Sequence, residues 1–128
     1  MKIEYQYFAE NGFLISKPTG TITLKDLQNY TDELYNDKAI KSPFMEIVDL
    51  EHIDDFDFGY FEAEEVINLF KKLITLKGYK GACLVVENDM TKIMSNVISS
   101  AGRDFSVSIT TFKTIEDACS YARFNHEL

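Results

Sequence analysis

The amino-acid sequence predicts an α/β fold in which four helices pack on a mixed, mostly parallel five-stranded sheet. Apolar segments typical of strands alternate along the chain with segments whose apolar residues recur at helical spacing. An Asn-Gly dipeptide near the start predicts an antiparallel hairpin before this alternation begins. The chain has 128 residues, 45% hydrophobic and 27% charged, as expected for one soluble globular domain over residues 1–128. The predicted order is β-β-α-β-α-β-α-β-α.

The first two strands form the predicted hairpin. Residues 3–8 alternate between apolar and polar side chains, which is typical of a half-buried strand. Asn11-Gly12 suits the positive φ angles of a type I′ turn, and residues 13–16 return as the second strand. We expect Pro18 and Gly20 to end the hairpin.

The first helix is predicted to start at Thr23, because Asp26 lies three residues later in the position of a capping box. Its apolar residues recur at helical spacing: Leu24, Leu27, Tyr30, Leu34 and Tyr35. Ser42-Pro43 breaks the chain, and residues 44–50 are predicted to form the third strand.

The second helix is expected from about Gly59 to Lys77, with Gly78 and Gly81 at its exit. Its predicted buried face consists of Ala63, Val66, Ile67, Phe70, Leu73 and Ile74. The continuously apolar segment 82–86 follows, and this pattern is typical of a central parallel strand that is covered on both faces.

The third helix is predicted to begin at Asn88 or Asp89 and to end at Gly102. Its expected apolar face consists of Ile93, Met94, Val97, Ile98 and Ala101. Residues 105–109 alternate like an edge strand, and Thr114 with Asp117 predicts the start of the last helix. Right-handed crossovers should place the helices on one or both faces of the sheet.

The charge distribution argues against several classes of partner. The net charge is −8, and nine acids but no base lie between Glu46 and Glu65. A nucleic-acid binder or an anionic membrane surface would require a basic stripe, and the longest basic grouping is thin: Lys71, Lys72, Lys77 and Lys80. No apolar run approaches the ~18–20 residues of a transmembrane helix. We therefore expect no nucleic acid and no membrane insertion.

The N-terminus and the cysteines indicate a cytoplasmic protein. Residues 1–6 contain no apolar core of a signal peptide. The two cysteines, Cys83 and Cys119, lie in apolar contexts and are expected to be reduced, buried side chains.

Three stretches carry a resemblance to a known family, namely residues 20–27 at the start of the first helix, 47–53 at the end of the third strand and 112–118 at the start of the last helix. With the order of elements, they resemble the STAS domains, the fold of the bacterial sporulation anti-sigma-factor antagonist. The chain is more closely similar to their uncharacterised SpoIIAA-like relatives. This resemblance covers nearly the whole chain and implies a regulatory or protein-interaction module.

One stretch departs from the family pattern. In the phosphorylated antagonists, an Asp and then paired Ser or Thr hydroxyls stand at the start of the second long helix. Asp57 aligns with that Asp, but Phe58 and Gly59 occupy the hydroxyl positions. No Ser or Thr lies between Pro43 and Ile74. The resemblance therefore implies a member of the fold that lacks the phosphoserine switch.

The acidic segment does not form a convincing metal site. Asp54 and Glu65 have the spacing of a calcium loop with Gly59 in sixth position, but Phe56 and Phe58 stand where oxygen ligands are needed. Asp54, Asp55 and Asp57 remain candidates for another ion, or form a solvated loop in which Asp57 caps the following helix. We predict no metal and no cofactor.

Catalytic groups are equally sparse. The histidines are His52, interpreted as a surface residue, and His126 in the C-terminal tail. Neither belongs to a recognisable triad, and Gly78-Tyr79-Lys80-Gly81 is too short for a phosphate-binding loop. The sequence gives no support for an enzyme.

Apolar residues around the second helix give the strongest functional signal. In helical projection, Phe61 falls nearly opposite the buried stripe, and Leu69 and Leu76 lie well off it. Phe56 and Phe58 either fold into the core or extend this surface. The leading hypothesis is a non-catalytic module that binds another protein or a second copy of itself. Its predicted contact residues are Asp57, Phe58, Tyr60, Phe61, Leu69 and Leu76.

The alternative hypothesis is a protein that binds a small apolar or lipid-like ligand. The SpoIIAA-like relatives are similar in outline to lipid-carrying folds, and ligands of open sheets collect beyond the carboxyl ends of parallel strands. Those ends are predicted at residues 50–57 and 87–89. The predicted lining is Phe56, Asp57, Met90 and Met94, although both methionines also suit a helix core.

Overall fold

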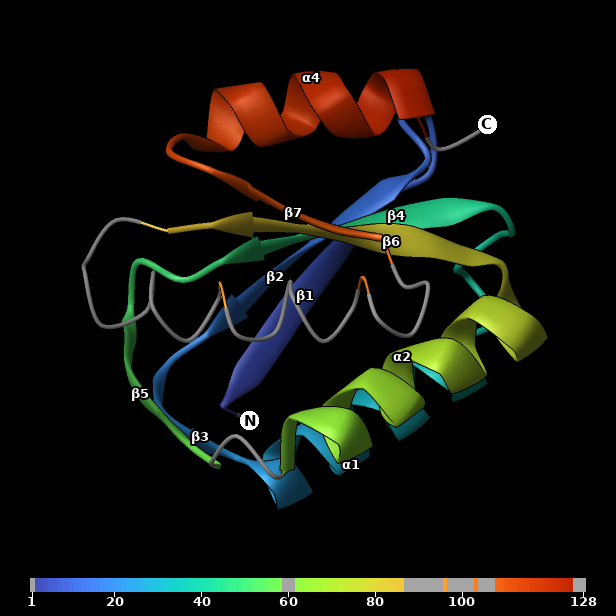
Figure 1. The fold of residues 1–128 in the computed structure, drawn as a ribbon. Helices are drawn as coiled ribbons and strands as arrows, with labels where there is room; N and C mark the ends of the chain where they lie inside the picture. The colour runs from blue at the N-terminus through green and yellow to red at the C-terminus, as the bar shows by residue number, and fades with distance from the viewer. Residues whose placement is uncertain (1, 59–61, 87–95, 97–102, 104–107, 126–128) are drawn as a thin grey trace.

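The computed structural model describes residues 2–58, 62–86, 96, 103 and 108–125, and it contains the predicted five-stranded sheet (Figure 1). Its strands are β1 (Ile3–Phe8), β2 (Phe13–Pro18), β4 (Phe44–Asp49), β6 (Tyr79–Val85) and β7 (Ile109–Phe112). Their order in the sheet is β1-β2-β4-β6-β7. The β1–β2 pair is antiparallel and the other three pairs are parallel, so the mixed, mostly parallel sheet is confirmed.

Helices cover both faces of this sheet. The helices α1 (Leu24–Asn36) and α2 (Ala63–Lys77) lie side by side on one face, and α4 (Ile115–Asn125) lies on the other (Figure 1). The larger apolar core lies under α1 and α2, and a smaller one packs against α4. The described residues hold these three helices, whereas four were predicted. The predicted helix at 88–101 falls on a stretch of which Asn96 alone is described.

Two short strands were not predicted. The strands β3 (Gly20–Thr23) and β5 (Ile53–Asp57) form a separate two-stranded parallel sheet, in which Ile22 stands opposite Phe56. The hairpin ends at Pro18 as expected, but the interpretation of the acidic residues 54–57 as a loop was wrong, because they belong to β5. Ile22 and Ile53 are buried, whereas Asp54, Asp55 and Asp57 are exposed. Because most residues of β5 are acids, the sequence pattern suggests a loop although Ile53 is buried in the core.

The helix boundaries confirm some capping predictions and correct others. The backbone N–H of Asp26 donates to Thr23 Oγ1 (3.1 Å), and the N–H of Thr23 donates to Asp26 Oδ2 (2.9 Å), which completes the predicted capping box of α1. The second helix begins at Ala63 and not at Gly59. Its N-cap is Glu62 without a side-chain cap, so Asp57 belongs to β5 and does not cap α2.

The C-terminal elements follow the predicted order with one shift. The edge strand β7 covers 109–112, whereas the prediction placed it at 105–109, and residues 104–107 lie outside those described. The N–H of Asp117 donates to Thr114 Oγ1 (3.2 Å), as predicted for the start of α4. Both cysteines are free thiols, Cys83 buried and Cys119 half-buried. Within the described part of the chain, each helix is too short or too polar to span a membrane.

Candidate functional site

The structure separates the residues predicted to contact a partner. Asp57 is exposed at the end of β5, and Leu76 is 55% exposed on α2, with Leu69 half-buried between them along the chain. Phe58 is only 5% exposed and packs in the core against Phe56, so it offers no contact surface and the surface interpretation of this residue was wrong. Tyr60 and Phe61 lie outside the described residues.

The outward side of α2 carries a row of four residues at helical spacing. Glu65, Leu69, Lys72 and Leu76 follow at steps of four, three and four, which places them on one side of the helix. Glu65 and Lys72 are exposed like Leu76. We call these four residues the outer stripe. Its two leucines lie beside charges of opposite sign.

Helix α1 extends this surface. Tyr35 is 39% exposed, and Lys72 Nζ lies 5.4 Å from the centre of its ring, within cation–π range. Lys72 Nζ also lies 4.0 Å from Asp32 Oδ1, an ion pair between two largely exposed side chains. Tyr35 and Leu76 therefore leave apolar area exposed on neighbouring helices, and Lys72, one turn before Leu76, contacts the Tyr35 ring.

The acidic segment does not gather into a metal site. In the described ranges, no group of three His, Cys, Asp or Glu side chains converges closely enough to hold a metal ion. His52 is exposed, with Nε2 3.8 Å from Glu51 Oε2, in agreement with its interpretation as a surface residue. The exposed Asp54, Asp55 and Asp57 form the acidic side of β5.

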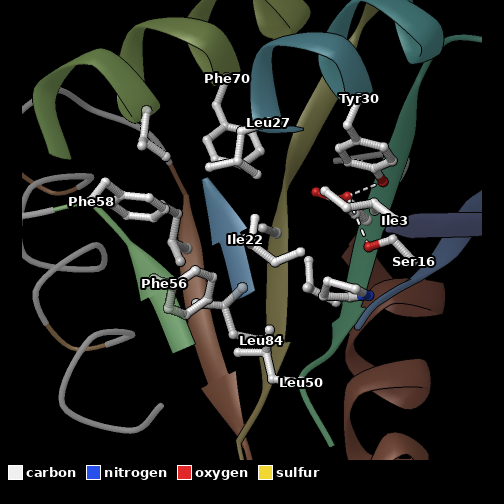
Figure 2. Close-up of a pocket in the computed structure, with 16 residues that line it drawn as sticks. Ile3, Ser16, Ile22, Leu27, Tyr30, Leu50, Phe56, Phe58, Phe70 and Leu84 are labelled. Atoms are coloured by element: carbon white, nitrogen blue, oxygen red, sulfur yellow. Dashed lines mark hydrogen bonds between the residues drawn. The ribbon is translucent and has the colours of Figure 1, made fainter. Parts of the chain in front are cut away.

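An apolar cavity of about 50 Å³ lies inside the core under α1 and α2. Phe56 and Phe58 line one end, and Ser16 and Tyr30 line the other (Figure 2). Phe56 was predicted to line a ligand site beyond the carboxyl ends of the parallel strands, whereas in the structure it lines this cavity in the core. Asp57 is not part of the lining, and Met90 and Met94 lie outside the described residues. The volume exceeds the space of one water molecule but is about a third of the ~150 Å³ that holds benzene in an engineered cavity.

A buried carboxyl group forms the polar end of the cavity. Glu46 on β4 is 0% exposed and accepts hydrogen bonds from three hydroxyls. Tyr79 Oη donates to Oε1 (2.6 Å), Ser16 Oγ lies 3.1 Å from Oε2, and Tyr30 Oη donates to the same oxygen. These donors come from β6, β2 and α1. Glu46 therefore links three strands and a helix through one side chain.

Burial dominates the electrostatics of this cluster. Desolvation raises the pKa of Glu46, although the hydrogen bonds from Tyr30, Tyr79 and Ser16 oppose the rise. Burial and the neighbouring Glu46 raise the pKa values of Tyr30 and Tyr79, which keeps both hydroxyls protonated as donors. On the other face of β6, burial raises the pKa of Cys83 to about 12, so its thiol is a poor nucleophile.

Sequence reasoning missed Glu46. The residue was counted only as one acid of the segment 46–65. A signal was present, because Glu46 interrupts the apolar segment 44–50, which was itself predicted to be a strand. An acid at the centre of such a strand is exposed or paired. The aromatic hydroxyls that pair with it come from distant segments, so the sequence could not show which of these held.

The fold is similar to solved structures, although no family model and no curated protein sequence matches the chain. One similar structure is an uncharacterised protein of the DUF3478 family with a SpoIIAA-like fold from Shewanella loihica PV-4. It has a TM-score of 0.60 and 19% identity, with 94% of this chain and 91% of that chain covered.

A second similar structure is the anti-sigma factor antagonist SpoIIAA in its unphosphorylated form. It has a TM-score of 0.55 and 9% identity, with 96% of this chain and 98% of that chain covered. At these identities the likeness shows the fold alone. The predicted STAS/SpoIIAA-like fold is thereby confirmed.

Proposed function

We propose that this protein is a non-catalytic STAS-like interaction module whose contact surface is the outward side of α2 with the neighbouring part of α1. The supporting observation is that Leu76 and Tyr35, both large and partly apolar, are exposed on neighbouring helices, and that Lys72, one turn before Leu76, lies over the Tyr35 ring. Such side chains, rimmed by charge, are typical of protein-binding surfaces. The similarity to an anti-sigma factor antagonist supports a regulatory module at the level of the fold.

The chemistry of the described residues favours binding over catalysis. Glu46 is the carboxyl group with the most unusual environment, but it is sealed from solvent and already bonded to three hydroxyls. At the position of the family's phosphorylated hydroxyl, Phe58 is apolar and buried. We infer that this module works without phosphorylation at that place. Tyr60 and Phe61, which precede α2 in the sequence, remain predicted contact residues.

A capture experiment tests the surface. The immobilised chain and a Leu76→Ser variant are exposed to an extract of the source cells, and captured proteins are quantified by mass spectrometry. We expect Leu76→Ser to reduce capture of a specific partner at least tenfold. The control Thr75→Ser, which introduces serine at the adjacent exposed position, should leave capture unchanged. Equal capture by all three proteins would contradict the proposed surface.

A second candidate function is the binding of a small apolar ligand in the cavity beside Glu46. The observation that favours it is the apolar lining at Phe56 with one polar end at Ser16 and Tyr30. The present volume limits such a ligand to fewer atoms than benzene unless the walls move apart. Native mass spectrometry of the purified protein tests this function. An added mass that is lost in Ala82→Val, which narrows the cavity, would support it, and the bare chain mass alone would argue against it.

A further inference from the structure

The charge of the side chains changes sign along α2. Its start carries Glu62, Glu64 and Glu65, and its later turns carry Lys71, Lys72 and Lys77. No acid lies between residues 66 and 86. The arrangement suits the helix dipole. It also makes two copies of α2 complementary in charge when they lie side by side and antiparallel, because each acidic start then meets a basic end.

The residues of the outer stripe carry this change of charge along the exposed side of α2. Leu69 lies near the middle, Glu65 precedes it by four residues, and Lys72 follows it by three. Leu76, the most exposed large apolar residue of α2, lies one further turn away. The stripe thus has an apolar centre between charges of opposite sign.

We propose that the outer stripe pairs with the same stripe of a second copy of this chain, with the two helices antiparallel about a two-fold axis at Leu69. This inference rests on the proposed function of α2 as a contact surface. Glu65 lies four residues to one side of the axis, and the partner's Lys72 lies three residues to that same side. The two residues therefore differ along the helix direction by one residue, about 1.5 Å. The two-fold axis creates this charge pair twice, and the contact closes with two copies.

The existing contacts of Lys72 do not prevent this pairing. Its ion pair with Asp32 is long at 4.0 Å, and both side chains are more than half exposed, so the pair contributes little to stability. Lys72 can move from Asp32 toward a carboxylate of the partner. Tyr35 then stands at the rim of the contact, where its exposed ring covers the charge pair from one side.

The size of the contact sets its strength. Fifteen residues make a helix about 22 Å long and about 10 Å wide, so the paired stripes bury less than the ~800 Å² per partner of a stable interface. The dimer therefore belongs to the weak, reversible class. Its charge pairs lie at the surface, where salt screens both their attraction and the repulsion between two copies that each carry a net charge of −8.

Reversing single charges tests the arrangement. Sedimentation velocity is measured up to ~1 mM protein at low and high salt for the wild type, Glu65→Lys, Lys72→Glu and an equimolar mixture of the two variants. We expect the wild type to dimerise, and each variant alone to associate at least tenfold more weakly at the same salt concentration, because like charges then meet twice. The mixture should regain dimers, since the lysine introduced at position 65 meets the glutamate introduced at position 72.

Two controls distinguish this dimer from a general effect of net charge and from a loss of the fold. Glu64→Lys makes the same change of charge about 100° around the helix and should leave the dimer intact. Thermal unfolding of every variant shows that the fold is kept. A wild type that stays monomeric, or a mixture that associates no better than its components, would overturn the proposed dimer.

If capture of a different protein still depended on Leu76 in that case, the interaction surface would stand with another occupant. If it did not, the proposed function would fail as well.

Discussion

Glu46 is the residue whose chemistry differs most from its surroundings. It lies at the centre of the sheet, fully buried, and its carboxyl group holds Ser16, Tyr30 and Tyr79 together. The free energy cost of burying this group is reduced by three hydrogen bonds and appears as a raised pKa. The protonation state of one side chain is thus coupled to the packing of α1 on the sheet.

This coupling predicts how stability depends on pH. Because the pKa of Glu46 is higher in the folded state, the folded chain holds more protons than the unfolded chain above the ordinary glutamate pKa of about 4.5. The contribution of Glu46 to stability therefore falls as pH rises from ~4.5 through the folded pKa, by about 1.4 kcal/mol for each pKa unit of the shift. Urea unfolding between pH 4.5 and 8 should show this fall in the wild type relative to Glu46→Gln, which does not titrate.

The comparison with Glu46→Gln removes other titrations. The backbone N–H of Thr23 lowers the pKa of Asp26, and the Tyr5 hydroxyl lowers the pKa of Asp37. The contributions of these two carboxyl groups to the free energy of unfolding therefore decrease as pH falls. The wild type and Glu46→Gln share both contributions, which therefore cancel in the difference between their free energies of unfolding. Tyr79→Phe removes one donor, which raises the pKa of folded Glu46 further, so the total fall should be larger and extend to higher pH. Parallel curves for the wild type and Glu46→Gln would contradict the coupling.

At the scale of elements, helix ends were more predictable than isolated strands. The Thr23–Asp26 capping box depends on residues three positions apart, and the sequence therefore located the start of α1. The pairing of β3 with β5 depends on segments about thirty residues apart. Within β5, the buried Ile53 is outnumbered by exposed acids, so local pattern favoured a loop. The outer stripe was partly predicted, through Leu69 and Leu76, because it follows from helical spacing.

The C-terminal end of α2 depends on a glycine. Gly78 has φ of +78°, and a Cβ there would lie 1.9 Å from Ser42 Oγ and 2.7 Å from Ser42 Cβ. Gly20 has a similar φ of +71° but open space around it. We expect Gly20→Ala to cost about 1 kcal/mol of unfolding free energy from backbone strain alone. Gly78→Ala should cost at least twice as much, because Ser42 must also move.

Urea unfolding of the two glycine variants measures this difference. The double variant Gly78→Ala/Ser42→Gly removes the clash and should recover the excess cost while keeping the backbone strain. Equal decreases in the free energy of unfolding for Gly20→Ala and Gly78→Ala would show that Ser42 moves aside at no energetic cost, and would contradict this prediction.

Across the whole molecule, the two faces of the sheet are packed differently. The cavity lies on the face covered by α1 and α2, whereas α4 places Ala118 and Ala122, both fully buried, directly against Cys83 and its neighbours. Ala82 and Cys83 are adjacent on β6 and belong to opposite faces. The same kind of enlargement should therefore have different effects at these two positions.

Enlarging one residue on each face tests this difference. Ala82→Val extends into the cavity and should change the free energy of unfolding by less than about 1 kcal/mol, whereas Cys83→Leu should lower it by about 1–3 kcal/mol through overpacking. Chemical denaturation of both variants gives the values. A larger decrease in the free energy of unfolding for Ala82→Val than for Cys83→Leu would contradict this prediction. It would mean that the cavity wall is rigid and that the core under α4 adapts to the larger side chain.

The position of β4 between β2 and β6 has a consequence for synthesis on the ribosome. A nascent chain can pair β4 with β2 early, but the other edge of β4 stays open until β6 has emerged. An open, apolar strand edge promotes aggregation between incomplete chains. Residues 1–64 carry 14 acids and 5 bases, so nascent chains repel one another during this interval, whereas residues 65–128, with 7 acids and 8 bases, add little charge when they close the edge. Of these two stretches, the one made first therefore carries the charge that keeps unfinished sheets apart.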